Sequence, residues 1–249
     1  MVERKASLEW VQPQWPAPAN IRALSTLRGG GCSPAPYACL NLGAGSGDDL
    51  AHVEHNRRLL ERASAMPGRP HWLQQVHGNT CVNANTPAVG VTADASYCAS
   101  PGHVCAILTA DCLPVLLCNR TGTKVAAAHA GWRGLHAGVL ESALNRFGTD
   151  RANVMAWLGP CIGAKRYEIG AEVYDAFIGD AEADAENFVP NRPGHWLANL
   201  AGLARARLRR AGVSQISGGD WCTASDAQRF FSYRRDGTTG RMATCIWMV

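Results

Sequence analysis

An α+β fold of layered strands and helices is predicted by three observations on this 249-residue sequence. Short apolar segments bounded by turn residues alternate only loosely with segments of helical spacing, which disfavours a regular βαβ series. Hydrophobic residues make up 47% and charged residues 18% of the chain, as in an ordinary globular protein. No repeat or linker-like run of Gly, Ser or Pro divides the chain, so we expect a single domain spanning residues 1–249.

The first fifty residues are expected to hold more loop than regular structure. Residues 1–23 read as a loop-rich N-terminal segment. Two glycine-rich turns follow, at 28–31 and 41–49, where the backbone can approach a ligand closely. The second turn leads into a helix predicted near 50–64. Either Asp48 or Asp49 is its expected N-cap, because a carboxylate can accept from the free amide groups of a first helical turn.

Strand signals dominate the middle of the chain. The expected strands are 71–76, 104–108, 114–118, 124–129 and 154–158, with a hairpin turn at 119–122 between two of them. Apolar residues at helical spacing predict a helix at 135–147, and two more helices are expected near 171–178 and 196–211. The final stretch, 243–249, returns to strand.

Charge and cysteine content exclude several classes of protein. The formal charge of +4 comes from 24 basic and 20 acidic residues, too small a surplus to indicate a nucleic-acid partner. The sequence shows neither a secretory leader pattern nor a long apolar run, so we expect no membrane span and a cytoplasmic location. In a reducing compartment the ten cysteines are thiols, metal ligands or catalytic groups and not a disulfide framework.

Three short segments each place a possible metal ligand at the end of an expected strand, namely His77, Cys112 and His129. Three protein ligands with one open position are the pattern of catalytic zinc, and thiolate with imidazole suits zinc or copper better than magnesium. The alternative is structural, with two turn histidines and one buried cysteine. The spacings alone, 35 and 17 residues, do not separate these interpretations.

The same residues also fit nucleophilic catalysis. Cys112 with His129 as its base, oriented by a carboxylate such as Asp94 or Asp111, would be a hydrolase arrangement. Metal ligation and base-assisted thiolate formation require the same residue types, so both remain open at this point. Asp111 adjoins a predicted ligand and would either orient a neighbouring group or cap a turn.

Several arginines are candidates for binding an anion. Arg28 lies in the first glycine turn, Arg133 follows Gly131 at the start of an expected helix, and Arg234 belongs to a basic segment near the end. Free amides at a helix start favour phosphate. For each arginine the competing interpretation is a solvated surface charge.

Eight motifs occur in order along the chain and together resemble one family. They are TLRGG at 26–30, LNLG at 40–43, QVHG at 75–78, ADA at 93–95, TADCLP at 109–114, AHAGWRG at 128–134, LGPCI at 158–162 and FSYRR at 231–235. This series is similar to the laccase-domain, or multicopper polyphenol oxidase-like, family. Its members are described as purine nucleoside phosphorylases, and some bacterial members as peptidoglycan editing factors.

The resemblance implies a fold, a metal site and an activity. The fold would be a sandwich with helices outside two layers of strand. One Zn²⁺ per chain would be held by His77, Cys112 and His129. The activity would be phosphorolysis of adenosine, inosine, guanosine or methylthioadenosine, with adenosine deamination as a second reaction, so the partners would be a small purine nucleoside and phosphate.

On this basis we expect the catalytic groups to be Cys112, His129, Asp111 and Arg28. The residues expected to bind substrate or phosphate are Arg28, Asn41, Arg133 and Arg234.

Two alternatives stay beside this interpretation. One is a Cys-His hydrolase that edits a peptidoglycan precursor. The other is a polyphenol oxidase with copper, but a laccase-like centre needs many closely spaced histidines, and this chain has eight with no His-x-His pair. Copper is therefore a possible occupant of the Cys-His₂ set, yet multicopper oxidation is disfavoured.

Overall fold

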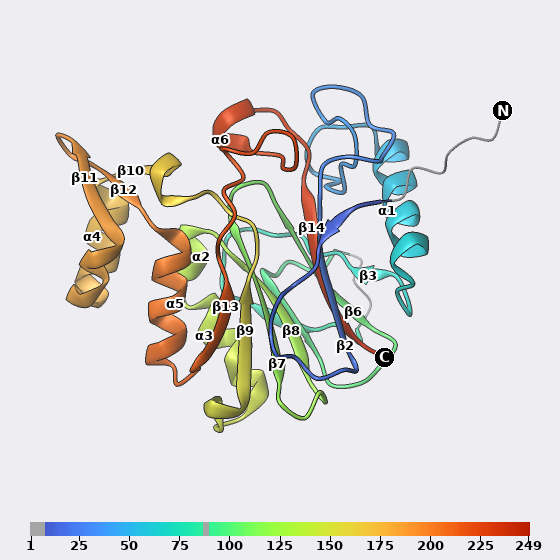
Figure 1. The fold of residues 1–249 in the computed structure, drawn as a ribbon, viewed down its shortest axis with the longest axis horizontal. Helices are drawn as coiled ribbons and strands as arrows, with labels where there is room; N and C mark the ends of the chain where they lie inside the picture. The colour runs from blue at the N-terminus through green and yellow to red at the C-terminus, as the bar shows by residue number, and fades with distance from the viewer. Residues whose placement is uncertain (1–7, 87–89) are drawn as a thin grey trace.

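The computed structural model describes residues 8–86 and 90–249, and its architecture is mixed α+β as predicted (Figure 1). Its strands form three sheets. The first sheet has the order β1-β2-β14-β6-β3, formed by Trp10–Val11, Ile21–Thr26, Met242–Met248, Val104–Thr109 and Pro70–His71. The second has the order β13-β9-β7-β8-β5-β4, formed by Gln215–Gly218, Val154–Leu158, Leu113–Asn119, Val125–Ala130, Ala95–Cys98 and Cys81–Asn83. The third has the order β10-β12-β11, formed by Glu168–Gly170, His195–Ala198 and Phe188–Arg192.

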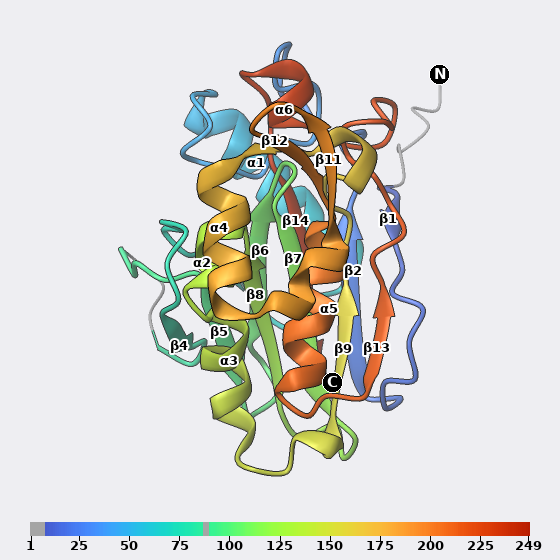
Figure 2. The ribbon, with the colours of Figure 1, turned by 90° about the vertical axis from the view of Figure 1, so that its left-hand side faces the viewer.

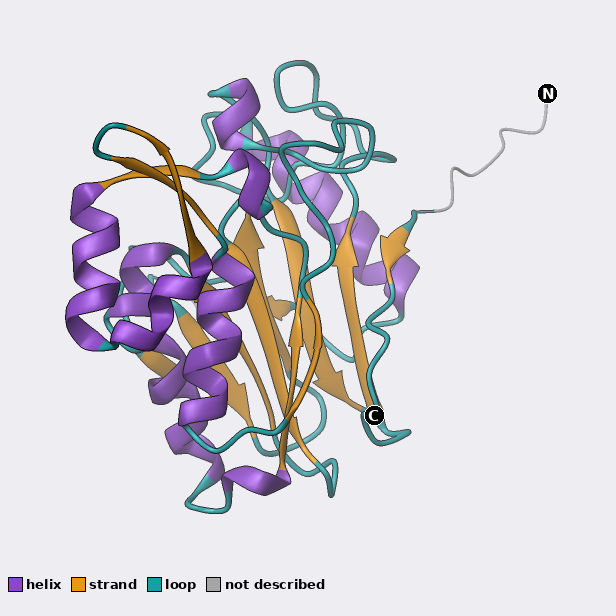
Figure 3. Ribbon diagram, turned by 60° about the vertical axis from the view of Figure 1, so that its left-hand side comes forward, coloured by secondary structure: helices purple, strands orange, loops and turns teal. Residues whose placement is uncertain are grey.

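The two large sheets pack face to face, and helices cover their outer faces (Figures 2 and 3). The helices are α1 (Leu50–Ser64), α2 (Trp132–His136), α3 (Val139–Leu144), α4 (Ala171–Asp180), α5 (Leu200–Arg210) and α6 (Tyr233–Asp236). Among the described residues no helix is both long and apolar enough to cross a membrane.

Strand β7 shows how the sequence builds these layers, because nearly every residue in it is buried. Side chains alternate between the two faces of a strand. Val115 and Leu117 belong to the core between the second sheet and the helices, and Leu116 and Cys118 belong to the core between the sheets. Such a strand must be apolar on both faces, which explains the continuous apolar run.

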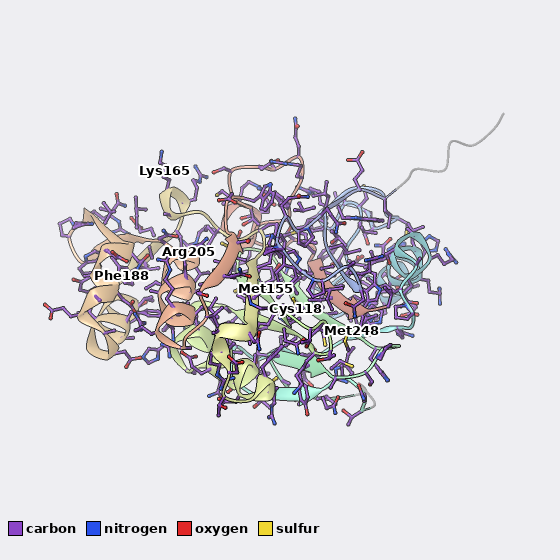
Figure 4. The ribbon with its side chains drawn as sticks, turned by 60° about the horizontal axis from the view of Figure 1, so that its bottom comes forward. Cys118, Met155, Lys165, Phe188, Arg205 and Met248 are labelled. Carbon is purple, nitrogen blue, oxygen red and sulfur yellow. The ribbon has the colours of Figure 1, made fainter. Side chains whose placement is uncertain are left out.

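The core between the two sheets takes side chains from both of them. Cys118 and Met155 come from the second sheet and Met248 from the first, and all three are labelled in Figure 4. A third core lies on the outer face of the first sheet, where Leu60 of α1 packs with Trp247 of β14. The sandwich implied by the family resemblance is therefore confirmed.

Most predicted elements are present. The strands expected at 104–108, 114–118, 124–129, 154–158 and 243–249 correspond to β6, β7, β8, β9 and β14. In the turn at 119–122 the Gly122 amide donates to the Asn119 carbonyl at 3.0 Å. Helix α1 is capped by Asp49, whose carboxylate accepts from the Ala51 amide at 2.8 Å. Helix α4 runs slightly beyond the expected 171–178.

Three expectations need correction. Of the strand expected at 71–76, only His71 lies in a strand, β3. Beyond it, Gln74 forms an isolated bridge with Thr92. The helix expected at 135–147 starts earlier, at α2, and is broken at Gly138, whose φ of 90° no regular helix contains. The helix expected at 196–211 starts only at Leu200, because residues 195–198 form β12 and Asn199 caps the helix. Of the segment 1–23, which was expected to be loop-rich, residues 1–7 lie outside the described part, and residues 8–23 hold β1 and the start of β2 and are otherwise loop.

Candidate metal centre

His77, Cys112 and His129 converge, although 52 residues separate the first from the last. Their ligand atoms all lie within 4.8 Å of one another, and the Cys112 Sγ is 3.8 Å from the His77 Nε2. The two imidazole rings meet edge to face with centroids 4.8 Å apart. His129 is buried near the end of β8, Cys112 is partly buried between β6 and β7, and His77 is exposed.

A buried carboxylate, Asp94, fixes two of these three residues. Its Oδ1 accepts from the His129 Nδ1 at 2.8 Å and from the His77 amide at 2.9 Å. Its Oδ2 accepts from the amides of Val76 at 3.2 Å and Gly78 at 2.7 Å. Asp94 therefore holds the loop that carries His77 and leaves the His129 Nε2 free to face Cys112. Such a carboxylate–histidine contact orients metal-binding imidazoles in proteins.

The charges in this cluster favour a thiolate. Burial by itself would raise the pKa of Cys112, but the neighbouring His129 and His77 outweigh it and lower that pKa to about 6. Burial opposes the charge of His129, whose pKa is nevertheless raised to about 9 by Cys112 and Asp94. The hydrogen bonds to Asp94 lower its own pKa in spite of its burial. A thiolate is the form of cysteine that both binds metal and attacks electrophiles.

Gly131 allows the three side chains to come this close. A Cβ atom at this position would lie 2.8 Å from the Cys112 Sγ and 3.0 Å from the His77 Cδ2. Both distances are too short for non-bonded contacts. Any larger residue would push these two side chains away from their present positions.

The donor set fits a zinc ion. One thiolate and two imidazoles are borderline-soft ligands, and a set of three protein ligands leaves one coordination position for substrate or water. The hydrogen bond from His129 to Asp94 fixes which imidazole nitrogen is presented. Within the described part of the chain this is the one cluster of at least three His, Cys, Asp or Glu side chains with ligand geometry.

The cluster forms part of the wall of a cavity of about 780 Å³. Of the arginines expected to bind substrate or phosphate, Arg133 and Arg234 line this cavity and Arg28 is not among its described lining residues. The Arg133 guanidinium stacks on Trp132, with its Cζ 4.4 Å from the centre of the indole ring. Arg234 stacks on Tyr167 at 5.3 Å and donates to the Glu168 carbonyl at 2.9 Å.

Arg28 and Asn41 take other positions than expected. The Arg28 guanidinium donates to the carbonyls of Ala38 at 3.1 Å and Ala227 at 2.9 Å, so it ties two loops together. Asn41 is fully buried, and its side chain accepts from the Gly43 and Arg241 amides at 3.0 and 2.9 Å. It too is absent from the described lining of the cavity. Asn41 thus fixes the backbone of the lining residues Gly43 and Arg241, whereas Arg28 holds loops outside the described lining.

Asp111 lines the cavity, but its carboxylate is turned toward the C-terminal part of the chain. It accepts from the Thr223 hydroxyl at 2.5 Å, the Ser232 hydroxyl at 3.0 Å and the Arg234 amide at 2.7 Å. The geometry therefore gives Asp111 a positioning role toward Arg234, and Asp94 takes the contact with His129. Between the two carboxylates considered from the sequence, it is Asp94 that orients the imidazole.

Sequence reasoning missed two cavity-lining arginines, Arg57 and Arg241, and the aromatic residue Trp72 beside Arg57. Tyr233 of the FSYRR motif also lines the cavity. Arg57 lies in α1, the helix predicted at 50–64, where the sequence alone suggests an ordinary solvated surface arginine. Arg241 adjoins the last strand and belongs to none of the eight motifs. No local pattern marks either residue as part of a site.

Comparison with known proteins gives a consistent picture. Residues 22–249 match the model of a family described as multi-copper polyphenol oxidoreductase laccase. The chain is 52% identical over 241 residues to purine nucleoside phosphorylase YfiH of Escherichia coli (strain K12), an overlap of 96% of this chain and 98% of that protein. It is also 52% identical over 242 residues to purine nucleoside phosphorylase PA4543 of Pseudomonas aeruginosa, with the same coverage.

Solved structures agree with this over nearly the whole chain. The fold is similar to the crystal structure of Neisseria meningitidis protein NMB0706, with a TM-score of 0.93, 44% identity and coverage of 96% of this chain and 98% of that one. It is also similar to YlmD from Geobacillus stearothermophilus, with a TM-score of 0.89, 30% identity and 96% coverage of both chains.

Proposed function

The chain belongs to the multi-copper polyphenol oxidoreductase laccase family, and from this premise we propose that it is a zinc-dependent purine nucleoside phosphorylase. Relatives at 52% identity carry the name purine nucleoside phosphorylase. The observation that carries the proposal is the His77–Cys112–His129 cluster in the wall of a cavity that four arginines also line. The proposed substrates are adenosine, inosine, guanosine and methylthioadenosine, with adenosine deamination as a second reaction.

Phosphorolysis breaks the bond between the ribose C1′ and the purine nitrogen and forms a bond between C1′ and a phosphate oxygen. The electron pair of the broken bond stays on the purine, which then takes up a proton. This transfer needs a bound phosphate close to C1′ and a means of offsetting the charge on the departing base. We infer that Arg133 and Arg234 contribute to phosphate binding, because both line the cavity and guanidinium groups match the phosphate oxygens.

The metal ligands serve the same cavity wall. His77, Cys112 and His129 would hold the zinc ion, which supplies Lewis-acid polarisation when bound. Asp94 keeps the His129 imidazole in one orientation, and Asp111 holds the segment that carries Arg234. Tyr167 and Trp132 line the same cavity and would exclude water from one side of a nucleoside bound there.

The direct test is incubation of the zinc-loaded protein with adenosine and phosphate, following adenine and inosine separately. Adenine that appears only with phosphate reports phosphorolysis, and inosine reports deamination. Cys112→Ala and His77→Ala should lose both the zinc and both products. Cys32→Ala and His55→Ala, which replace exposed residues, are matched controls and should keep both. Wild-type protein that makes neither product would refute the proposal.

Metal analysis of protein purified without added metal tests the cofactor. We expect about one zinc ion per chain and no copper, because the described residues offer one three-ligand group. Copper in stoichiometric amount together with oxidation of a phenol would instead support the polyphenol oxidase alternative.

The Asp94–His129–Cys112 series also supports a second candidate function, that of a cysteine hydrolase. Asp94, His129 and Cys112 form a carboxylate–imidazole–thiol series with the pKa of the thiol lowered, which is also the arrangement of a cysteine nucleophile and its base. A hydrolase of this kind could act on an amide of a peptidoglycan precursor. Amide hydrolysis that survives strong chelation and ends on thiol alkylation would favour it over the zinc enzyme.

A further inference from the structure

Arg241 reaches the cavity from a backbone that is fixed on both sides. Its amide donates to the Asn41 Oδ1 at 2.9 Å, and its carbonyl accepts from the Leu42 amide at 3.1 Å. One guanidinium nitrogen, Nη1, donates to the carbonyls of Thr239 at 2.7 Å and Gly240 at 3.0 Å. These contacts hold the side chain at one end and leave Nε and Nη2 for another acceptor.

The glycine turn beside Arg241 is shaped to admit its side chain. A Cβ atom on Gly43 would lie 2.6 Å from the Arg241 Cγ and 2.9 Å from its Cβ. Gly43 to Ser46 line the cavity next to Arg241. The turn and the arginine thus form one wall whose position depends on the absence of a side chain at residue 43.

The charge of Arg241 is not neutralised by a direct partner. Within residues 8–86 and 90–249 no carboxylate lies within 4.0 Å of its guanidinium. Burial lowers its pKa, which the more distant charges of Cys112 and Asp111 partly offset. A half-buried guanidinium that faces a cavity without an ion-pair partner is a strong site for an anion, because low polarity strengthens its attraction.

A second cation stands on the same wall. The Arg57 Nε donates to the Leu42 carbonyl at 3.0 Å, and its guanidinium stacks on Trp72 at 4.3 Å. The nearby Glu54 forms its ion pairs with Arg58 and Arg69 instead. Arg57 also lines the cavity, so its charge adds to the positive potential there.

We propose that Arg241, supported by Arg57, forms the main phosphate-binding subsite of the cavity on the wall of residues 43–46. The ligand is the inorganic phosphate that phosphorolysis consumes, so the assignment rests on the function proposed above. Arg133 and Arg234 are exposed and more strongly screened by water, whereas Arg241 is partly buried and fixed before phosphate arrives. Arg241 therefore carries the larger share of phosphate affinity.

The test measures phosphate binding by calorimetry, without nucleoside, and then the KM values for phosphate and nucleoside. Arg241→Gln should raise the Kd and the KM for phosphate at least about tenfold, because a hydrogen bond to a charged group is lost. The KM for nucleoside should change far less. Arg209→Gln, which replaces an exposed arginine of α5, is the matched control and should behave as wild type.

A second variant keeps the guanidinium charge of Arg241 but shifts its position. Gly43→Ala should displace the Arg241 side chain and weaken phosphate binding in the same direction. Gly29→Ala is its control, since nothing lies within 4 Å of a Cβ built there. If Arg241→Gln fails to fold, Gly43→Ala alone decides the question.

The outcomes separate this proposal from the proposed function. Adenine release by wild type together with unchanged phosphate affinity in both variants overturns the subsite and leaves the phosphorylase intact. Phosphate binding that depends on Arg241, with no adenine release by wild type, supports the subsite as an anion site and refutes the phosphorylase. Adenosine 5′-monophosphate that binds through Arg241 more tightly than inorganic phosphate would overturn the assignment to the free anion.

Discussion

Replacing Asp94 by asparagine should damage both the stability of the protein and its metal site. Each carboxylate oxygen accepts two hydrogen bonds, Oδ1 from His129 and His77 and Oδ2 from Val76 and Gly78. An asparagine has one carbonyl oxygen, so its NH₂ group must face two of these donors. Two partly buried donors that lose their acceptor cost up to about 1–3 kcal/mol each, or up to about 6 kcal/mol in total.

Zinc affinity should fall about 10- to 100-fold in Asp94→Asn, the usual effect of removing a carboxylate that orients a metal-binding imidazole. Urea unfolding of the metal-free protein gives the free energy of unfolding, and competition with a chelator gives the zinc affinity. Asp180→Asn is the control, because the side chain of Asp180 is 49% exposed and its ion pairs within residues 8–86 and 90–249 are with His136 and Arg207. That change should cost less than about 1 kcal/mol.

Acid adds an independent check on Asp94. Its pKa is lower in the folded protein than in the unfolded chain, so its contribution to stability is complete above the unfolded value of about 3.9. The contribution is lost as the pH falls through the lower folded value. Asp94→Asn should therefore lose less stability than wild type on acidification. A variant with wild-type stability and wild-type zinc affinity would refute the role given to Asp94.

Two further predictions concern the metal cluster. Gly131→Ala should weaken zinc binding at least about tenfold while the protein still folds, because the added methyl group would displace the side chains of Cys112 and His77. A zinc affinity equal to that of the control Gly29→Ala would contradict this prediction. In protein stripped of metal, the rate of iodoacetamide labelling at Cys112 should rise with pH around a midpoint near 6, since the thiolate is the reactive form. Mass spectrometry should find Cys105, whose pKa is raised by burial, unlabelled, and added zinc should protect Cys112. Labelling of Cys112 that begins only near pH 8.5, the ordinary thiol value, would contradict this prediction.

The sequence predicts the sheets well where strands are buried on both faces. Strands β7, β8 and β9 are continuous apolar runs with clear turns at their ends, and their predicted bounds agree with the structure to within one residue or two. The helix predicted for residues 196–198 is wrong because a short strand precedes the helix there, with no glycine or proline between the two to mark the boundary. Asn199 is the signal that marks the true start of the helix.

In the candidate site, too, some residues can be predicted from the sequence and others cannot. The three metal-ligand candidates sit inside distinctive local motifs and are found from the sequence. The choice between Asp94 and Asp111 depends on which carboxylate meets His129 across the second sheet, and that contact spans 35 residues. Arg241 depends on a contact with Asn41 that spans 200 residues. Long-range pairing of this kind leaves no trace in local spacing.

Strand β14 has a consequence for how the molecule is made. It is the last strand of the chain, yet it lies in the middle of its sheet, between β2 and β6. The first sheet therefore cannot be completed until residue 248 has been synthesised. Until then β2 can pair with β1 alone, because its second partner, β14, lies more than 200 residues away. Because distant pairings form slowly and expose strand edges meanwhile, the newly made chain passes through a stage in which this sheet is open. Loss of residues 242–249 would leave the sheet in two separate parts, β1 with β2 and β6 with β3.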